Sequence, residues 1–189
     1  MARKKNPEKR TRIFKATLQL IETNGMAGVK MAEVASLSRM AVGTVYLYFA
    51  DKHALFQALR AYIDQNLRSH LDPLMASDQF IQQFQQVWRG FLQYCIDFPD
   101  HMVFLDQWDR SPYHQLPGAT PSYAFVVFHQ ILENGKIEGW VGSIKTALMV
   151  NLVVGASKEI VNQYMLDLID LNTDDFHDIY QLVWRAIRK

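Results

Sequence analysis

The sequence predicts an all-α protein of about nine helices, built as an N-terminal three-helix helix-turn-helix domain and a larger C-terminal helical domain. Apolar residues recur every three or four positions through most of the chain, as they do in helices that bury one face. Capping residues, prolines and glycines bound these segments, and no segment shows the alternation of a half-buried strand. With 49% hydrophobic residues and 12% aromatic residues, the 189-residue chain can bury a substantial core.

The first predicted helix begins after Asn6. The Asn side chain can accept a hydrogen bond from a free amide of the first turn, Pro7 loses no bond there, and Glu8 complements the helix dipole. The apolar residues of segment 13–21 then follow a helical period. Asn24-Gly25 is a stop signal, so we expect a helix of about four or five turns.

Two short helices and one long helix follow. Segments 31–38 and 42–48 have helical patterns but are too short to be stable alone, so they must pack against other helices. Asp51 caps a long helix over residues 52–71, which ends before an Asp-Pro pair. We expect this long helix to link the two domains.

The domain boundary is expected near the start of that long helix. Residues 1–53 hold the helix-turn-helix domain, and residues 54–189 hold the larger helical domain. Segment 110–121 contains three prolines and a glycine and is predicted to be a loop. The remaining helices are expected at about 77–98, 99–108, 122–134, 143–168 and 173–188.

Charge is distributed unevenly between the two domains. Residues 1–53 carry a net charge of +6 and the rest of the chain carries −5, although the whole chain is at +1. Lys and Arg near phosphates gain free energy by releasing counterions, so the asymmetry favours a polyanionic partner at the N-terminal end. A basic arm that is simply solvated is the alternative.

The compartment is indicated by cysteine and hydrophobic content. Cys95 is the single cysteine, so no intrachain disulfide is possible and nothing requires an oxidising compartment. The longest apolar run, 147–156, is interrupted by Asn151 and is too short to span a bilayer. We therefore expect a cytoplasmic protein with no membrane partner.

Segment 31–52 has the layout of a helix-turn-helix. Two short helices joined by a tight turn, behind a basic arm, allow one helix to enter the major groove of duplex DNA while the other crosses the backbone. Val34, Leu37, Met40 and Val45 can pin the two helices together. The residues that remain outside are small or capable of hydrogen bonding.

The same segment resembles the TetR/AcrR (tetracycline-repressor) family of one-component bacterial transcription regulators. The resemblance lies in Val34-Ala35, Arg39-Met40-Ala41, Gly43-Thr44-Val45-Tyr46-Leu47-Tyr48-Phe49 and Lys52. It implies a homodimeric regulator, a repressor that binds a palindromic operator in duplex DNA and is released by a small hydrophobic or aromatic effector.

The resemblance also implies which residues grip the DNA backbone. Thr44, Tyr48 and Lys52 match a phosphate-gripping set of a hydroxyl, a phenol and a cation. Tyr46 matches a residue at the edge of the groove. Core packing is the alternative for both tyrosines.

Base reading falls to small residues at the start of the second short helix. Ala41, Val42 and Gly43, together with Ala32, have almost no hydrogen-bonding capacity, so contacts to thymine methyls and DNA shape must contribute. The expected DNA contacts are Lys4, Lys5, Ala32, Arg39, Ala41, Val42, Gly43, Thr44, Tyr46, Tyr48 and Lys52.

Three positions depart from the family pattern. Arg39 replaces the usual turn glycine, a position that often needs a positive φ, so the turn is either rebuilt or mildly strained. Ala41 replaces the usual Ser cap, which costs about 1 kcal/mol of local stability. Lys30 replaces a usual Thr before the second helix.

For the C-terminal domain, the resemblance implies effector binding and dimerisation, with the last two helices forming a four-helix interface across a two-fold axis. Apolar stripes on these helices suit an interface, although some of their residues can be ordinary core. The expected interface residues are Leu148, Leu152, Ala156, Ile160, Val183 and Ile187, with Leu182 on the same stripe as the last two.

The middle helices are rich in aromatic residues. This composition fits an apolar cavity for a hydrophobic or aromatic effector, and plain core packing is the alternative for each residue. The expected effector contacts are Phe84, Trp88, Phe91, Phe104, Trp108, Phe125 and Phe128.

Metal binding and catalysis find little support. No Gly-x-Ser-x-Gly elbow, Gly-rich phosphate loop or His-Glu-x-x-His pair is present, so we expect neither an enzyme nor a cofactor. Two hypotheses stay open: a ligand-responsive dimeric repressor, and an architectural or protein-interacting DNA-binding module without an effector. The acidic and His residues weighed as metal ligands match no established spacing: Asp100, His101, Asp106, Asp109, His114 and His129.

Overall fold

The computed structural model describes residues 6–115 and 120–189, except for the side chains at 114, 115, 173 and 174. These described residues form nine α-helices and two short 3₁₀ helices, with no strand and a single antiparallel bridge between Val141 and Arg188. The predicted all-α class and the predicted number of helices are confirmed. The chain divides into two compact units, one made of Met1–Ile63 with Pro99–Ala119 and the other of Asp64–Phe98 with Thr120–Lys189.

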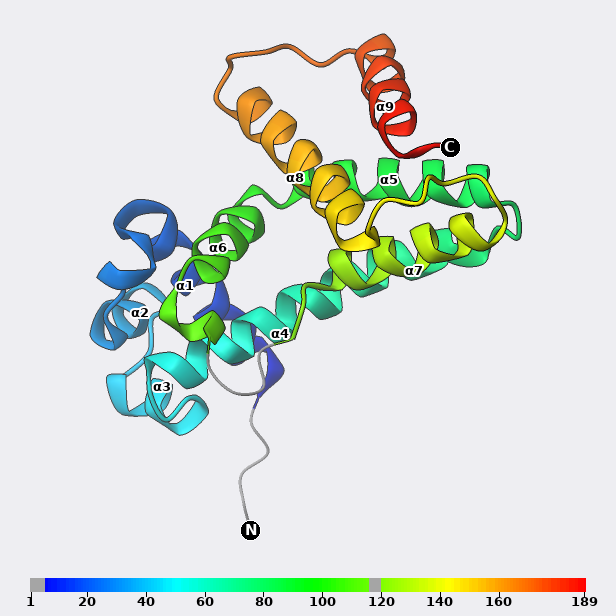
Figure 1. Cartoon of the computed structure of the whole chain (residues 1–189). Helices are drawn as coiled ribbons and strands as arrows, with labels where there is room; N and C mark the ends of the chain where they lie inside the picture. The colour runs from blue at the N-terminus through cyan, green and yellow to red at the C-terminus, as the bar shows by residue number, and fades with distance from the viewer. Residues whose placement is uncertain (1–5, 116–119) are drawn as a thin grey trace. The chain divides into compact units, whose positions relative to one another are not determined.

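The first unit contains the helix-turn-helix (Figure 1). Helix α1 packs against both α2 and α6, and α2 packs against α3. Its core is apolar and continuous from α1 through α4 to α6. Its helices are α1 (Pro7–Gly28), α2 (Met31–Leu37), α3 (Val42–Tyr48), the part of α4 (Lys52–Leu71) up to Ile63, α6 (Pro99–Asp109) and the 3₁₀ helix η2 (Pro112–Gln115).

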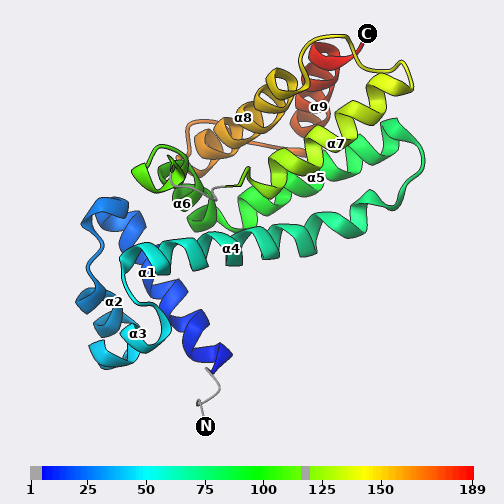
Figure 2. The same cartoon turned by 60° about the horizontal axis from the view of Figure 1, so that its bottom comes forward.

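The second unit is a helical bundle (Figure 2). Helices α5, α7 and α8 pack on one another, and α9 packs on α8. An aromatic cluster carried by α5, α7 and α9 fills its interior. Its elements are the remainder of α4, the 3₁₀ helix η1 (Asp72–Ala76), α5 (Phe80–Asp97), α7 (Tyr123–Ile137), α8 (Thr146–Met165) and α9 (Thr173–Ile187).

Helix α1 is longer than the sequence predicts. Asn6 caps it as expected, its side chain accepting a hydrogen bond from the Glu8 amide at 2.8 Å. The expected stop at Gly25 is instead a kink, where the residue takes φ 69° and ψ 163° before the helix continues to Gly28. The Met26 amide at this kink donates to Oε1 of Gln107 at 2.6 Å, so a side chain from α6 satisfies a donor that the kink releases.

Helix α6 belongs to the first unit although it follows α5, a helix of the second unit, in the chain. Phe104, Leu105 and Trp108 are buried in the core that α1 also lines. The expected domain boundary at residue 53 stays a prediction. The compact units instead meet within α4, after Ile63, and α6 is part of the first unit.

Helices α5 and α8 are shorter at their ends than expected, whereas α7 continues to Ile137, beyond its expected end at about 134. Helix α5 begins at Phe80, after a 3₁₀ turn, and not at Ser77. The Ser77 hydroxyl accepts a bond from the Gln79 amide, which holds the chain in a turn before the helix starts. Helix α8 is also shorter than the predicted 143–168.

Candidate nucleic-acid interface

Helix α3 presents a partly apolar face to solvent and is held from behind by a buried residue. Val45 is fully buried, as is Val34 of α2, so these two side chains pin the short helices together as the sequence predicts. Met40 is half-buried, and Leu37, which was expected to join them, is instead 41% exposed. The opposite face of α3 carries exposed Val42 and Tyr46, each with more than two-fifths of its surface accessible, and Leu47, which is 73% exposed. An exposed helix on a rigid backing is the geometry that a major groove accepts.

The turn between α2 and α3 contains a residue in the left-handed region. Arg39 has φ 56°, so the position does adopt the conformation that glycine adopts without strain. Backbone bonds hold it there: the Arg39 amide donates to the Ser36 carbonyl at 3.0 Å, and the Met40 amide donates to the Ala35 carbonyl at 2.9 Å. The turn keeps its shape and carries about 1 kcal/mol of backbone strain.

Both short helices start without a side-chain cap. Ala41 is the N-cap of α3 and Lys30 is the N-cap of α2, and neither makes a capping hydrogen bond. Lys30 instead forms an exposed ion pair with Glu33 at 3.0 Å, which contributes little to stability. Neither residue therefore makes the capping hydrogen bond that a Ser or Thr side chain would make at that position.

Tyr48 is bonded to the start of α1. Its hydroxyl accepts a hydrogen bond from the Asn6 amide at 3.0 Å and lies 3.4 Å from the Asn6 carbonyl, to which it donates. The ring is half-buried beside Phe49. The phenol therefore joins the end of α3 to the residue that follows the basic arm.

Lys52 is bonded to the end of α1. Its Nζ donates to the Ala27 carbonyl at 2.8 Å and to the Val29 carbonyl at 3.0 Å, and it also lies over the ring of Phe56. A cation at these carbonyls satisfies acceptors that the helix end leaves open. Lys52 has a structural role in addition to any contact with phosphate.

The other predicted DNA contacts differ in how far they are exposed. Ala32, Ala41 and Gly43 are exposed, and Thr44 is half-buried. Lys4 and Lys5 lie outside the described residues. Contact with DNA stays a prediction for the whole set.

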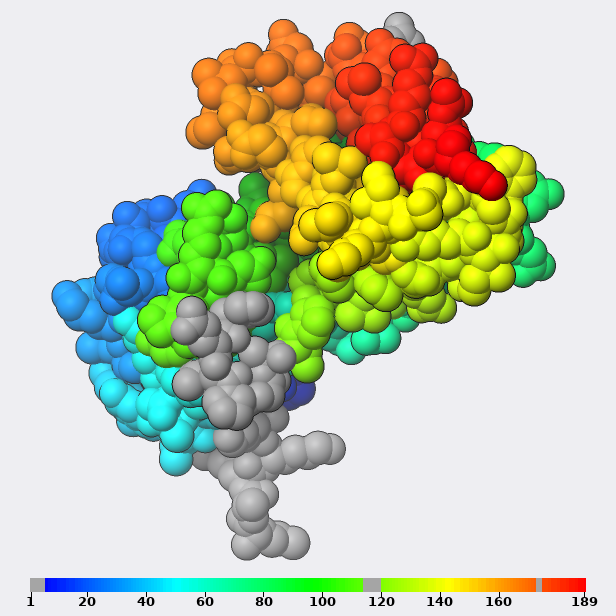
Figure 3. Space-filling model, in the orientation of Figure 1, coloured from blue at the N-terminus to red at the C-terminus, as the bar shows by residue number. Residues whose placement is uncertain are grey.

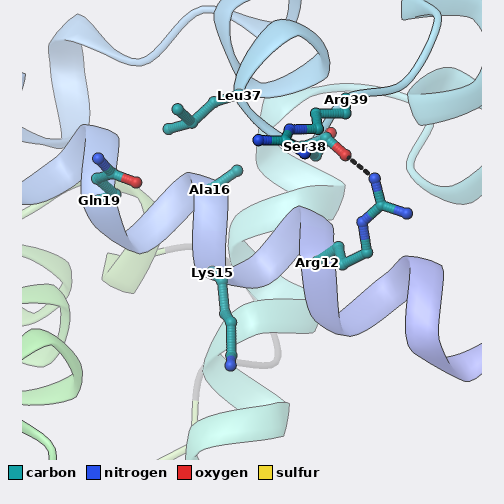
Figure 4. A pocket seen from close by; sticks show the side chains of 7 residues that line it. All are labelled: Arg12, Lys15, Ala16, Gln19, Leu37, Ser38 and Arg39. Atoms are coloured by element: carbon teal, nitrogen blue, oxygen red, sulfur yellow. Dashed lines mark hydrogen bonds between the residues drawn. The ribbon is translucent and has the colours of Figure 1, made fainter.

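A basic pocket that the sequence analysis did not identify lies beside this turn. It has a volume of about 440 Å³ and lies between α1 and the end of α2 (Figure 4). Arg12 and Lys15 of α1 line it together with Arg39 of the turn. The net charge of residues 1–53 points to such a site, but only the fold brings the turn against α1.

The predicted effector residues separate into two groups. Phe84, Trp88, Phe91 and Phe128 are buried in the second unit, where their rings contact each other or Tyr180 at centroid distances of 5.6–6.3 Å. Half-buried Phe125 stacks on His129 in the same unit. Phe104 and Trp108 instead belong to the core of the first unit, because α6 packs on α1.

Two polar groups within this aromatic cluster are notable. The Trp88 indole donates to the Ser157 hydroxyl at 3.1 Å, and that hydroxyl donates to the Val153 carbonyl. The hydroxyl of Tyr180, a buried residue of α9, has no hydrogen-bond partner among the described residues. Burial raises the pKa of Tyr180 and keeps the phenol protonated as a donor. Nothing in the sequence distinguishes Tyr180 from a core residue, because an aromatic residue on an amphipathic helix usually packs in the core.

The predicted interface residues divide by exposure. Leu148 and Leu152 of α8 are exposed, and Ala156 and Ile160 are half-buried along the same helix. Val183 and Ile187 of α9 are instead buried in the core of the second unit, at 6% and 1% exposure. They cannot offer surface to a partner. Leu182 is the exposed leucine of that helix, and the surfaces of α8 and α9 adjoin in Figure 3.

The part of the chain that the structure describes contains neither a metal-binding cluster nor a helix able to cross a membrane. No three His, Cys, Asp or Glu side chains there are grouped to hold a metal ion. Burial lowers the pKa of His101, whose ring contacts Tyr62. None of the described helices combines the length and the apolar character needed to cross a bilayer.

Two family matches cover most of the chain. Residues 13–59 match the family described as bacterial regulatory proteins of the tetR family. Residues 79–188 match a tetracyclin repressor-like C-terminal domain. The second match alone spans more than half of the sequence.

Relatives of similar length support these matches. An uncharacterised HTH-type transcriptional regulator of Haemophilus influenzae is 24% identical over 192 residues, covering 94% of each chain. The structure of a TetR family transcription regulator from Marinobacter aquaeolei VT8 has a TM-score of 0.84 at 15% identity over 96% of each chain. A TetR-family regulator structure from Haemophilus influenzae has a TM-score of 0.80 at 18% identity over 99% of this chain and all of the other. These structures show the same fold.

Proposed function

Because the chain belongs to the TetR family of bacterial transcription regulators, we propose that it is a dimeric repressor that leaves a palindromic operator when a small hydrophobic molecule binds. The observation that carries the proposal is the exposed face of α3, backed by buried Val45 and Val34. A short helix held in this way can enter the major groove while α2 crosses the backbone. Sequence preference then depends on Ala41, Val42 and Gly43, which favour methyl contacts and DNA shape.

Dimerisation is supported by the exposed leucines of the second unit. Leu148, Leu152 and Leu182 expose between 46% and 66% of their surface on two adjoining helices. Apolar side chains gathered on one face favour association with a self-complementary copy. Two heads held by one interface read half-sites about one helical turn apart.

The effector response is supported by the aromatic cluster and by Tyr180. A buried hydroxyl without a partner costs about 1–3 kcal/mol, so a ligand that offers it an acceptor gains binding energy. Phe84 and Trp88 lie 6.2 and 5.6 Å from the ring of Tyr180. We therefore expect an apolar effector that carries a carbonyl or carboxylate oxygen.

A second candidate function is a DNA-binding module without an effector. The mutual contacts of Phe84, Phe91 and Phe128 favour it, since rings that pack on one another form an ordinary core. The two candidates share the DNA-binding head and differ only in the response to small molecules.

The decisive experiment selects binding sites from a random duplex library and then tests release. Selection is expected to enrich a two-fold symmetric site with half-sites about one turn apart. A panel of aromatic and aliphatic ketones and carboxylic acids is then added to the complex, with fluorescence anisotropy as the readout. Release by a member of the panel, lost in Tyr180→Phe, supports the repressor.

Two outcomes contradict parts of the proposal. No enrichment of any site by the folded protein contradicts DNA-binding regulation itself. Enrichment of a palindrome with no release by the panel, and with no change in thermal stability on adding its members, favours the effector-free module.

A further inference from the structure

The basic pocket beside the recognition helix is built from two elements of the first unit. Arg12, Lys15 and Gln19 share one face of α1 because they are three, four and seven positions apart. Ser38 and Arg39 close the other side from the α2–α3 turn (Figure 4). The pocket therefore lies immediately before the first residue of α3.

The pocket gathers positive charge without a neutralising carboxylate. None of the residues that line it is acidic, and none of the ion pairs in the described part of the chain involves Arg12, Lys15 or Arg39. In Figure 4 Arg12 points to the turn, whereas Lys15 points away from it and reaches the pocket only by a rotation of its flexible side chain. An anion in the pocket is attracted by all three cations.

The positions of two of the side chains, Arg12 and Arg39, are fixed before any anion binds. The Arg12 guanidinium donates to the Ser38 carbonyl at 2.6 Å, which fixes its orientation and uses one of its five N–H donors. Arg39 occupies a left-handed position where glycine fits without strain. Strain of this kind concentrates at functional positions, and here it places a cation at the edge of the pocket.

The neighbouring helix identifies duplex DNA as the source of the anion. Arg39 lies two positions before Ala41, where the exposed start of α3 begins. The base-reading residues there offer almost no hydrogen bonds, so affinity must come from the backbone. Yet Tyr48 and Lys52 already bond to α1, at Asn6 and at two carbonyls.

We propose that this pocket is a phosphate-binding site in which Arg12, Lys15 and Arg39 hold a backbone phosphate of duplex DNA. The site flanks the N-terminal end of the recognition helix and so fixes its register in the groove. This inference rests on the proposed function as a DNA-binding regulator and names a contact that the family motif does not contain.

The test removes two of the three charges and measures the salt dependence of DNA binding. Lys15→Gln is combined with Arg39→Asn, because Asn tolerates the left-handed conformation and keeps the turn. Arg12 is left unchanged because it also supports Ser38. Binding to a labelled duplex of about 30 base pairs of mixed sequence is followed by anisotropy from about 50 to 200 mM KCl.

The expected result is a smaller salt slope. Loss of two charges that contact phosphate lowers the slope of log affinity against log salt by about 1–2, and lowers affinity at about 100 mM salt by tenfold or more. The matched control is Lys145→Gln with Lys189→Gln, two exposed cations of the second unit. This control loses the same net charge and should keep the wild-type slope.

The remaining outcomes separate the pocket from the proposed function. A wild-type slope in the pocket variant, with circular dichroism unchanged, overturns the pocket and leaves DNA binding intact. If millimolar inorganic phosphate raises the wild-type melting temperature but not that of the pocket variant, while the DNA slopes agree, the pocket serves a free anion and the proposal is overturned. Failure of the wild-type protein to bind the duplex contradicts the regulator function.

Discussion

The two compact units offer opposite surfaces to their surroundings. The first unit buries an apolar core and exposes cations such as Lys15 and Arg39 beside its recognition helix, α3. The second unit buries an aromatic cluster and leaves leucines such as Leu148 and Leu152 exposed. Both are built from α-helices that pack around an apolar core. The difference teaches that the same helical pattern yields a surface for a polyanion or for a second copy, according to which side chains the packing leaves outside.

The largest effect is expected on the dissociation constant of the dimer when a charge is placed in the apolar surface of the second unit. Leu152→Glu puts a charge into the proposed interface from both copies, and we expect the dissociation constant of the dimer to rise by about a hundredfold or more. Sedimentation velocity across a concentration series measures it. Val126→Glu is the matched control, because Val126 on α7 is 45% exposed and Leu152 is 46% exposed. Equal effects of the two changes would argue against an interface on α8.

The next effect tests whether Lys52 is structural in the first unit. Lys52→Ala removes two charge-assisted bonds to the Ala27 and Val29 carbonyls, so the free energy of unfolding should fall by about 1–2 kcal/mol. Urea denaturation followed by circular dichroism measures the change. Lys145→Ala in the second unit is the control, with an expected change within about 0.5 kcal/mol. An unchanged free energy of unfolding in Lys52→Ala would contradict the structural role of Lys52 and leave phosphate contact as its expected role.

A smaller effect is expected where a positive φ is relieved, and it can be compared at the two non-glycine residues that have a positive φ in the described part of the chain. Arg39→Gly relieves strain and should raise the free energy of unfolding by about 0.5–1 kcal/mol, after allowance for the greater freedom of glycine in the unfolded chain. Asp167→Gly, at φ 54°, should change it by less, since Asp tolerates this conformation better. Thermal denaturation measures both. Only Arg39→Gly should also weaken DNA binding, so a more stable variant with full DNA affinity contradicts the basic pocket.

The smallest effect is a difference in acid sensitivity. Burial lowers the pKa of His101 in the first unit, an effect that neighbouring Asp100 opposes. The unfolded state therefore binds a proton more readily, and stability falls as pH drops below about 6.5 towards the lower folded pKa. A hydrogen bond from Thr146 lowers the pKa of Glu133 in the second unit, so its contribution is lost only below about pH 4.5. Stability measured from pH 7 to 5 should fall less in His101→Gln, and an equal fall in both proteins contradicts the role of His101.

Local sequence signals were sufficient to predict the short elements of the first unit. The bounds of α3 and α4 agree with the prediction because the apolar period, and for α4 also the Asp51 cap, act over a few residues. The left-handed position of Arg39 is one of the two outcomes that the family resemblance implied for this turn, the other being a rebuilt turn. These features depend only on neighbours in the chain.

Features that depend on distant segments were not predictable in the same way. The sequence shows that α9 is amphipathic, but not that Val183 faces its own core while Leu182 faces outward. It shows that Phe104 is apolar, but not that α6 returns to α1. The cations of the pocket were visible as net charge, and only tertiary packing brings Arg12 against the turn. In each case the missing information is which surfaces meet.

The return of α6 to the first unit has a consequence for synthesis on the ribosome. The ribosome must synthesise residues 64–98, all of which belong to the second unit, before α6 emerges. Until then the apolar side of α1 that Phe104 and Trp108 cover has no partner from α6. The DNA-binding head therefore cannot complete its core as an early N-terminal product. A nascent chain released before α6 would carry the recognition motif without the packing that supports it.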